Sequence, residues 1–412
     1  MRRTLLAALV GALVISGLAA QPASAKSKSP SKVGLVSFYK SDYDRSTNKA
    51  TMWIDWPNAK RAEKYEVFVS RSYSMKGAKK YTVKSSKTKL TKLSRGKDYF
   101  VQVRGVNGSK RGSRSTTVGH TTIPLAGPEN NLLPLRIMSY NVCSRVCGTA
   151  TWTTFRQAGV YERAGASGAD IIATQEADNL VELPGYAMAA NKSAKRIFYN
   201  PARLAIAPAT TPPAVAPVPN KDINGCDLTY QWGQPMGYIF LGFHDGGCRY
   251  AVWTEFVDIA TGRQFMMVDV HLVTGGGSTP TRQRREEMNT LLANVGMANT
   301  KGLQVLYAGD FNSHRGSSGG DVVGSVMNAS FLFDGFDLAR RLFNQHVNSF
   351  QGFKASPSIG YKYGDHIDKV WGNPTTTRFD AWYNFANFGA DGRLVQPNPS
   401  DHSPILVDLR IG

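Results

Sequence analysis

Hydrophobic and polar residues alternate in the first quarter of the chain. Residues 50–56, 64–70, 79–85 and 98–107 show this alternation, and clusters of Lys, Ser and Gly separate them. A period of two arises when successive side chains point to opposite faces of a strand. Short strands at this spacing, with turn residues between them, predict an all-β sandwich. We expect this sandwich over residues 30–123, followed by a linker over residues 124–134.

The pattern changes after the linker, where longer apolar runs alternate with amphipathic stretches. Strands are predicted at 135–142, 169–176, 265–273, 304–312, 366–372 and 402–409, and helices at 151–168 and 281–295. Strands dominate and helices separate some of them, which predicts a sheet core with helices outside. Residues 135–412 are therefore expected to form one α+β domain.

Charged and amide residues stand at or near the ends of the apolar runs in this second part. They are Asn141, Glu176, His271, Asp310, Asn312, Asp401 and His402, and Asp368 lies inside a further apolar run. Charges at buried strand ends are unfavourable unless they are paired or bind a metal. A single such residue is usually satisfied by the backbone, but one common rim would explain all of them together.

The residue types fit one chemistry. Carboxylate oxygens and an Asn carbonyl suit a hard divalent cation such as Mg²⁺ or Ca²⁺. Two histidines can polarise a phosphoryl oxygen and move a proton. Together these groups point to metal-assisted attack of water on a phosphate ester.

The order of short motifs in this part resembles that of the endonuclease/exonuclease/phosphatase superfamily. The motifs are SYNV (139–142), TQE (174–176), HL (271–272) followed by Arg282, GDFN (309–312), IDKV (367–370) and SDHSP (400–404). The resemblance implies two packed sheets flanked by helices, a four-layer α/β/β/α sandwich, with the site at the strand ends. It also implies a divalent ion, Mg²⁺ with Ca²⁺ or Mn²⁺ as alternatives.

The same resemblance implies roles for the acids and amides. Glu176 matches the principal metal ligand, with Asn141 beside it and Asp401 close to the metal. Asp310 matches the acid that orients the attacking water or holds a second ion. Asn312 matches a residue that contacts a phosphate oxygen.

For the histidines, the resemblance assigns His402 to the scissile phosphate as base or charge stabiliser, and His271 as a second phosphate-facing histidine. Asp368 matches the acid that hydrogen-bonds His402. Asp365 and His366 are rivals for that position, but Asp368 lies within the apolar strand.

Two arginines are expected to bind substrate. Arg282 follows the HL motif, and Arg196 precedes an apolar strand at a position where pancreatic-type deoxyribonuclease carries an acid that supports its second histidine. Here Lys195 and Arg196 occupy that place, so His271 is expected to lack an acidic partner. Arg196 would face a phosphate or solvent.

The first part resembles a fibronectin type III module. The resemblance rests on Trp56, Tyr65, Leu90, Gly96, Tyr99, Val101 and Asn107. In that family the Trp is a core residue, and a Tyr near the start of a late strand forms a tyrosine corner. No catalytic residues are expected in this module.

The charge of the chain is concentrated in that first part. The formal net charge is +19, and residues 26–124 contain 23 Lys and Arg against 6 Asp and Glu, whereas residues 125–412 contain 24 of each. Lysine on edge strands can simply prevent aggregation. An excess this large favours a polyanionic partner, namely DNA, a cell-wall polymer or an acidic lipid surface.

The N-terminus has the pattern of a secretory signal. Arg2 and Arg3 precede an apolar stretch over residues 5–20, and an A-x-A site ends at Ala25. A retained anchor is disfavoured because the apolar stretch is shorter than the roughly 20 residues that a span requires. No later segment is apolar enough to cross a membrane. The mature chain is expected to be secreted, either extracellular or associated with the cell wall.

Four cysteines suit an oxidising compartment. We predict two local disulfides, Cys143–Cys147 and Cys226–Cys248, over a zinc site, because no further metal-binding spacing accompanies them.

The sequence thus favours a secreted metal-dependent phosphodiesterase that acts on nucleic acid, with an endonuclease preferred. One alternative is a phospholipid phosphodiesterase or a phosphomonoesterase, and another is a non-catalytic polyanion-binding protein. DNA and RNA are not distinguished, and the oligomeric state is left open.

Overall fold

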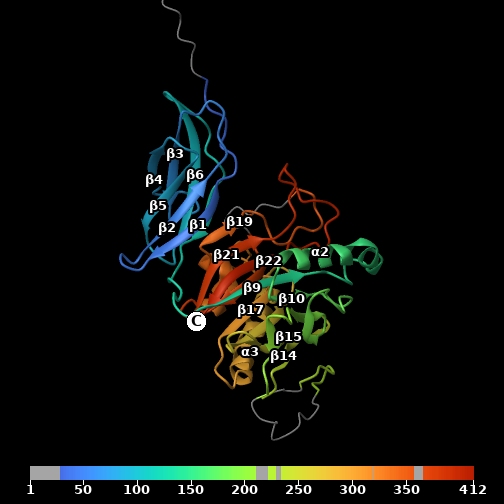
Figure 1. The fold of residues 1–412 in the computed structure, drawn as a ribbon. Helices are drawn as coiled ribbons and strands as arrows, with labels where there is room; N and C mark the ends of the chain where they lie inside the picture. The colour runs from blue at the N-terminus through green and yellow to red at the C-terminus, as the bar shows by residue number, and fades with distance from the viewer. Residues whose placement is uncertain (1–27, 210–220, 229–232, 319, 357–364) are drawn as a thin grey trace, which may run out of the picture.

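The protein consists of an N-terminal β-sandwich and a larger α+β domain (Figure 1). The computed structural model describes residues 28–209, 221–228, 233–318, 320–356 and 365–412. The predicted signal peptide lies outside these residues. Within them, no helix has the length and apolar character needed to cross a membrane.

The N-terminal part contains eight strands in the described residues. They are β1 (Ser37–Asp44), β2 (Lys49–Asp55), β3 (Lys64–Ser70), β4 (Lys79–Val83), β5 (Lys87–Leu93), β6 (Asp98–Asn107), β7 (Lys110–Arg111) and β8 (Val118–Thr121). Strands β1, β2 and β5 form one layer, and β4, β3, β6, β7 and β8 form the other. The four strands predicted from alternation correspond to β2, β3, β4 and β6.

Aromatic residues hold this sandwich together. Trp56 and Tyr65 meet edge to face with ring centroids 5.4 Å apart. The Tyr99 hydroxyl accepts a hydrogen bond from the Ser94 backbone N–H at 2.9 Å, as a tyrosine corner would. The assignment to the fibronectin type III family stays a prediction.

The larger domain is built on two sheets. The first contains β9 (Leu133–Asn141), β10 (Ile171–Gln175), β11 (Ala187–Lys192), β12 (Lys195–Tyr199), β19 (Arg341–Phe343), β21 (Thr377–Asn384) and β22 (Ile405–Ile411). The second contains β13 (Leu204–Ile206), β14 (Met236–His244), β15 (Gly247–Asp258), β16 (Gln264–His271), β17 (Val305–Asp310), β18 (Phe333–Asp334) and β20 (Asp368–Gly372). The first sheet has the order β11-β12-β10-β9-β22-β21-β19, and the second has β13-β15-β16-β17-β20-β18 with β14 beside β15.

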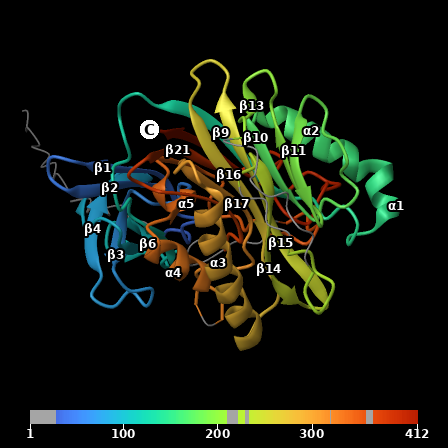
Figure 2. The same ribbon diagram turned by 90° about the horizontal axis from the view of Figure 1, so that it is seen from below.

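Helices cover the outer faces of both sheets (Figure 2). A continuous helical segment comprises α1 (Thr149–Thr151), the π-helix η1 (Trp152–Arg156) and α2 (Gln157–Ser167), and the other helices are α3 (Ser278–Ala298), α4 (Val322–Ala329) and α5 (Gly335–Leu338). Val160 of α2 packs in one cluster with Phe198 of the first sheet. Leu291 of α3 packs with Trp253 of the second sheet. Because a separate apolar cluster fills the space between the sheets, the layer order is helix, sheet, sheet, helix, which matches the predicted four-layer sandwich.

The two parts of the chain share one sheet. Strand β1 pairs with β19 through Lys40 and Arg341, so the first sheet continues through β1, β2 and β5 to ten strands. Next to this junction the buried His120 ring lies 5.7 Å from Phe38 and 4.9 Å from Phe336, measured between ring centroids. The N-terminal sandwich is therefore packed against the larger domain and is not suspended on a free linker.

Candidate active site

The predicted site residues meet where two βαβ units present the carboxyl ends of their strands. In the first sheet β9 and β10 are parallel, and in the second β16 and β17 are parallel. Parallel strands joined by a helix end at the same edge of a sheet, which is where such folds bind ligands. The four strands end at Asn141, Gln175, His271 and Asp310, and Glu176 follows Gln175 directly.

The remaining site residues reach the same edge from strands that run in the opposite direction. Asp368 is the first residue of β20, directly opposite Asp310 in the antiparallel register. Asp401 and His402 precede β22, which begins at Ile405 and runs antiparallel to β9. The sequence interpretation placed Asp401 and His402 at a strand end, and this was wrong. The start of an antiparallel strand lies at the same edge as the end of its neighbour, which explains why the common rim nevertheless forms.

The period of two explains why these particular residues face one another. Along β16, Phe265 and Met267 belong to the cluster between the sheets, and Asp269 and His271 continue the same row. Along β17, Leu306 and Ala308 precede Asp310 in the same way. The inner rows are therefore apolar along the strands and polar only at the carboxyl end.

A glycine allows β16 and β17 to approach at this end. Gly309 has φ +153°, and a Cβ there would overlap the carbonyl oxygen of Val270. The close approach places His271 beside Asp310 in the parallel register. This accounts for the glycine of the GDFN motif.

Asn141 joins the two principal acids. Its amide nitrogen donates to Glu176 Oε1 at 3.0 Å and to Asp310 Oδ2 at 3.1 Å. Its amide oxygen accepts the backbone N–H of Cys143 at 3.1 Å. The role of Asn141 as a metal ligand stays a prediction, because an amide oxygen can accept a second partner beside that N–H. In the structure its side-chain nitrogen positions the two carboxylates.

His402 is held between two buried acids. Its Nδ1 lies 2.9 Å from Asp368 Oδ2, and its Nε2 lies 3.8 Å from Asp310 Oδ2. Burial alone would lower the pKa of His402, but Asp368, through its charge and its hydrogen bond, together with Asp310 and Asp401, raises the pKa to about 10. The imidazole is therefore protonated at neutral pH, which suits a group that stabilises negative charge.

His271 has the opposite protonation state. Burial first, and then the nearby charges of Lys195, Arg249 and His402, lower the pKa of His271 well below its usual value. Its Nε2 lies 3.7 Å from Asp310 Oδ2. His271 is therefore neutral at physiological pH, and its ring can donate one hydrogen bond and accept another without adding charge to the site.

Asn312 completes the wall of the site next to Asp310. Its backbone N–H donates to Asp310 Oδ1 at 2.9 Å, and its side-chain nitrogen donates to the Leu272 carbonyl at 3.1 Å. The residue has φ +48°, an uncommon backbone conformation that Asn tolerates better than most residues. One amide proton is left to contact a substrate oxygen.

The acids fit a cation. Burial first, and then the neighbouring carboxylate of Asp368, raise the pKa of Asp310 to about 7. Burial, and to a lesser extent Asp401 and Asp178, raise the pKa of Glu176 against the hydrogen bond from Asn141. Asp368 Oδ1 is buried with no hydrogen-bond partner among the described residues. Crowded, partly unpaired carboxylates of this kind suit Mg²⁺, with Glu176, Asp310 and the nearby Asp401 as the residues that would hold it.

These groups border a cavity of about 850 Å³. Glu176, His271, Asp310, Asn312, Asp401 and His402 line it, whereas Asp368 and Asn141 lie buried behind them. The cavity is large enough for a nucleotide-sized ligand. Phe350, which is 48% exposed, lies at the rim, with its ring 5.1 Å from that of His402.

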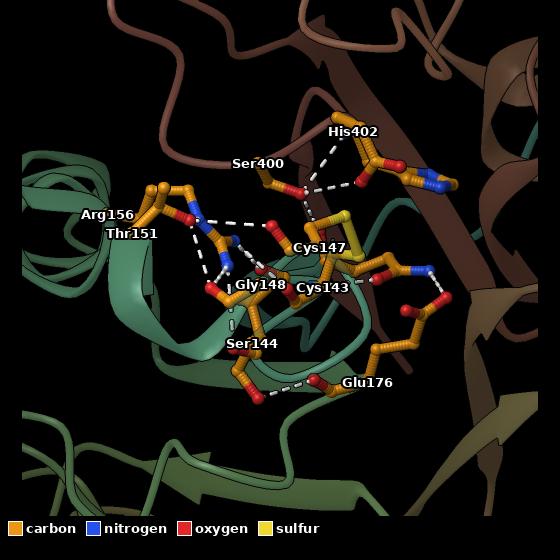
Figure 3. Close-up of a disulfide and its surroundings, with 12 residues drawn as sticks. Cys143, Ser144, Cys147, Gly148, Thr151, Arg156, Glu176, Ser400 and His402 are labelled. Carbon is orange, nitrogen blue, oxygen red and sulfur yellow. Dashed lines mark hydrogen bonds between the residues drawn. A yellow bond between two sulfur atoms is a disulfide. The ribbon is translucent and has the colours of Figure 1, made fainter. Parts of the chain in front are cut away.

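The loop closed by the Cys143–Cys147 disulfide supports Glu176 (Figure 3). The Ser144 hydroxyl donates to the Glu176 carbonyl at 2.7 Å, and the Ser144 backbone N–H donates to the same oxygen at 2.8 Å. The buried Arg156 donates to the Cys143 carbonyl at 2.9 Å. The loop therefore fixes the backbone of the principal acid, which has φ +50°.

Ser400 supports the histidine in a similar way. Its hydroxyl donates to the Asn141 carbonyl at 2.7 Å and accepts the His402 backbone N–H at 3.1 Å, so it ties β9 to the segment before β22 (Figure 3). The second disulfide joins Cys226 to Cys248. Both predicted pairings are confirmed. The sequence did not show that Cys143 and Cys147 border the cavity.

Two predicted substrate-binding residues lie elsewhere. Arg282 is on α3, is exposed, and pairs with Glu286 at 2.7 Å. Arg196 donates to the Asp178 carbonyl at 3.2 Å and does not line the cavity. In β12, Lys195 and Ile197 share the face between the sheets, whereas Arg196 and Phe198 face α2. Lys195, not Arg196, therefore lines the cavity, and the alternation of β12 was the signal that could have shown it.

Comparison with known proteins gives matches among solved structures alone, because no family model and no curated protein matches the chain. The chain is similar to an endonuclease/exonuclease/phosphatase family protein from Bacteroides thetaiotaomicron, with 18% identity, 68% of this chain and 99% of that chain covered, and a TM-score of 0.49. It is also similar to a mannosyl-6-phosphatase from the same bacterium, with 18% identity, 67% and 99% covered, and a TM-score of 0.48. D. rerio TDP2, complexed with single-strand DNA product, gives 14% identity, 67% and 98% covered, and a TM-score of 0.44. These similarities identify no substrate for this chain, so we base its function on the site residues.

Proposed function

We propose that the chain is a secreted, metal-dependent phosphodiesterase that cleaves nucleic acid internally. The observation that supports this most directly is the pair of hydrogen bonds from Asn141 to Glu176 and Asp310, which gathers two acids beside the Asp368–His402 pair. A cation-binding acid pair next to an imidazolium suits a reaction in which negative charge grows on a phosphoryl group.

Each residue of the site has its own role in the proposed reaction. A water oxygen attacks phosphorus and gives up a proton to the Asp310 carboxylate. The bond to the leaving oxygen breaks, and that oxygen takes a proton from solvent and departs as an alcohol. The His402 imidazolium donates a hydrogen bond to a non-bridging oxygen, where charge develops. The Asn312 amide orients the same phosphate. A bound Mg²⁺ would supply Lewis-acid polarisation of the phosphoryl group.

One feature favours nucleic acid over lipid or sugar phosphates, and a second is compatible with it. Phe350 offers an exposed ring at the cavity rim, and aromatic rings bind bases by stacking. The lysine-rich face of the N-terminal sandwich suits a polyanion. These lysines lie on or next to the edge strands β4 and β5, and all of them are exposed: Lys76, Lys79, Lys80, Lys84, Lys87, Lys89 and Lys92.

The function is tested by incubating the purified protein with supercoiled plasmid, with and without MgCl₂ and a chelator. Nicking that requires the ion is expected, and Glu176→Ala and His402→Ala should each reduce the rate by about 100- to 1,000-fold. Sphingomyelin and an inositol phosphate are assayed in parallel. Turnover of either of these with an intact plasmid would refute the nuclease assignment and favour the lipid or monoester alternative.

The basic face has its own test. Strand β5, which carries part of the basic face, lies six strand positions from β9 in the shared sheet, roughly 29 Å at about 4.8 Å per strand, so a long polymer can contact both regions. Replacing Lys79, Lys84, Lys87 and Lys89 with Gln should weaken the salt dependence of plasmid cleavage, by about 0.9 in log–log slope for each phosphate that is no longer neutralised. Hydrolysis of bis(p-nitrophenyl) phosphate should not change. An unchanged slope on plasmid would refute the role of this face.

A further inference from the structure

Lys195 is a buried cation that the proposed reaction does not use. It is 4% exposed and lines the cavity. Among the residues that the structure describes, no side chain or carbonyl forms a hydrogen bond or an ion pair within 4 Å with its ammonium group. The charges of Asp269, Asp178 and Glu287 act on it without direct contact. The ammonium group therefore remains able to bind an anion that enters the cavity.

A second cation faces the same space. Arg249 of β15 lines the cavity with a side chain that is 20% exposed, and it pairs loosely with the exposed Asp245 at 3.3 Å. Burial first lowers the pKa of Lys195 to about 8, with Asp269 opposing and Arg249 adding to the shift. Two like charges that approach each other at a cavity wall are typical of an anion site.

The acid that acts most strongly on Lys195 is only partly engaged elsewhere. Asp269 Oδ1 accepts a hydrogen bond from Gln175 across the two sheets at 2.7 Å, whereas Asp269 Oδ2 is buried with no hydrogen-bond partner among the described residues. His244 Nδ1, which also borders this part of the cavity, lies 3.1 Å from Gln283 Nε2. Lys195 and Arg249 are therefore the cations that can meet an anionic ligand on this side of the cavity.

The backbone fixes Lys195 relative to the acids of the site. The turn before it contains Ser193 with φ +42° and Ala194 with φ +61°, and such values are unusual for residues other than Gly and Asn. The Ala194 carbonyl accepts the backbone N–H of Ala177, the residue after Glu176, at 2.8 Å. The strained turn thus ties Lys195 to the segment that carries the principal acid.

We propose that Lys195 and Arg249 form a subsite that binds a second phosphate group of the substrate, next to the phosphate that is hydrolysed. An ammonium and a guanidinium that converge on one space match the several oxygens of a phosphate better than a single carboxylate. The subsite rests on the proposed function and specifies its substrate, which carries phosphates on both sides of one sugar or an equivalent spacer. It lies on the His271 side of the cavity, because the charges of Lys195 and Arg249 both act on that histidine.

The subsite is tested by calorimetric titration of the full chain with thymidine 3′,5′-bisphosphate and with thymidine 5′-monophosphate, both in MgCl₂. The wild type should bind the bisphosphate at least about 10-fold more tightly. Lys195→Met and Arg249→Met should each reduce this preference to below about 3-fold. Lys192→Met is the matched control, because Lys192 is paired with Lys195 across the hairpin but bonds to Asp227 at 2.8 Å.

The outcomes separate the subsite from the function itself. The subsite would be overturned if the wild type bound the bisphosphate and the monophosphate equally tightly. It would also be overturned if both Met variants kept the wild-type preference for the bisphosphate. Hydrolysis of bis(p-nitrophenyl) phosphate, measured in parallel, reports on the proposed function without a second phosphate. Lys195→Met removes a cation near Asp269. If that variant does not fold, the bisphosphate preference of Arg249→Met alone tests the subsite, because the Arg249 side chain is partly exposed and its loss should leave the fold intact.

Discussion

The Asp368–His402 pair gives the sharpest prediction about the chemistry. Asp368→Asn preserves the size of the side chain and an oxygen that can accept from Nδ1, but it removes the charge. The two groups lie 2.9 Å apart, and their side chains are 0% and 6% exposed. Little solvent screens them, so the substitution acts almost entirely on the electrostatics of the histidine.

The magnitude follows from the pKa of His402. A rise from 6.5 to about 10 corresponds to about 5 kcal/mol in favour of the imidazolium, shared among Asp368, Asp310 and Asp401. Asp368 makes the largest contribution to the rise. Because burial alone lowers the pKa of His402, loss of this acid should lower that pKa and deprotonate the imidazole at the alkaline end of the pH range. A site that loses such a donor typically slows by about 100- to 1,000-fold.

The assay is Mg²⁺-dependent hydrolysis of bis(p-nitrophenyl) phosphate between pH 5.5 and 9.5. The variant should be slowed most at high pH and should recover relative to wild type as the pH falls, because protonation then restores the imidazolium. Asp365→Asn is the matched control. That acid lies three residues away, pairs with His314 at 3.1 Å and does not line the cavity.

Two results would refute the reasoning. One is a variant within about threefold of wild type at pH 8, and the other is relative activity that rises with pH, which would indicate that His402 acts as a base. Removing one partner of a buried pair also destabilises the fold, by about 3–5 kcal/mol. Circular dichroism and thermal unfolding must therefore show that the variant is folded under assay conditions.

Two further predictions concern the disulfides and a buried acid. Replacing Cys143 and Cys147 with Ser should reduce turnover at least about 10-fold, yet it should lower the unfolding free energy by only about 2 kcal/mol, because the loop is short. Replacing Cys226 and Cys248 with Ser should lower the unfolding free energy, measured with urea, by about 3 kcal/mol and should affect turnover less. The reverse ranking would contradict the support of Glu176 by the first loop. Burial raises the pKa of Glu287 from 4.5 to about 7. The contribution of Glu287 to the folding free energy is therefore complete below about pH 4.5 and is lost as the pH rises to 7. The loss amounts to at most about 3 kcal/mol. Glu287→Gln should flatten that part of the stability profile, and an unchanged slope would exclude Glu287 as its source.

Much of the site could be predicted because its residues interrupt apolar strands. Asp310 follows a buried run, and a carboxylate there has few explanations other than a partner or an ion. The meeting of Glu176 with Asp310 followed from the expectation of one common rim. The β-sandwich was predicted from alternation alone, although β1, β5, β7 and β8 were not identified.

Other features depend on contacts that a single sequence does not contain. The direction of the Asn141 amide is set by the N–H of Cys143, which donates to its oxygen. The contact of Gln175 with Asp269 joins two sheets that are far apart in the chain. The second strand of the β14–β15 hairpin is long and buried on both faces, so its sequence gives no clear period of two. Arg196 was the residue expected to face a phosphate or solvent, whereas the alternation of β12 places Lys195 at the cavity.

The ten-stranded sheet has a practical consequence for anyone who shortens this protein. A fragment that starts at residue 124 would strip β19 of its neighbour and uncover the ring of Phe336. An open strand edge beside a bare apolar surface promotes self-association. The basic sandwich therefore covers a strand edge and an apolar surface of the larger domain, and it also carries most of the positive charge. Truncation would remove both at once, whereas substitutions of its outer lysines change the charge alone.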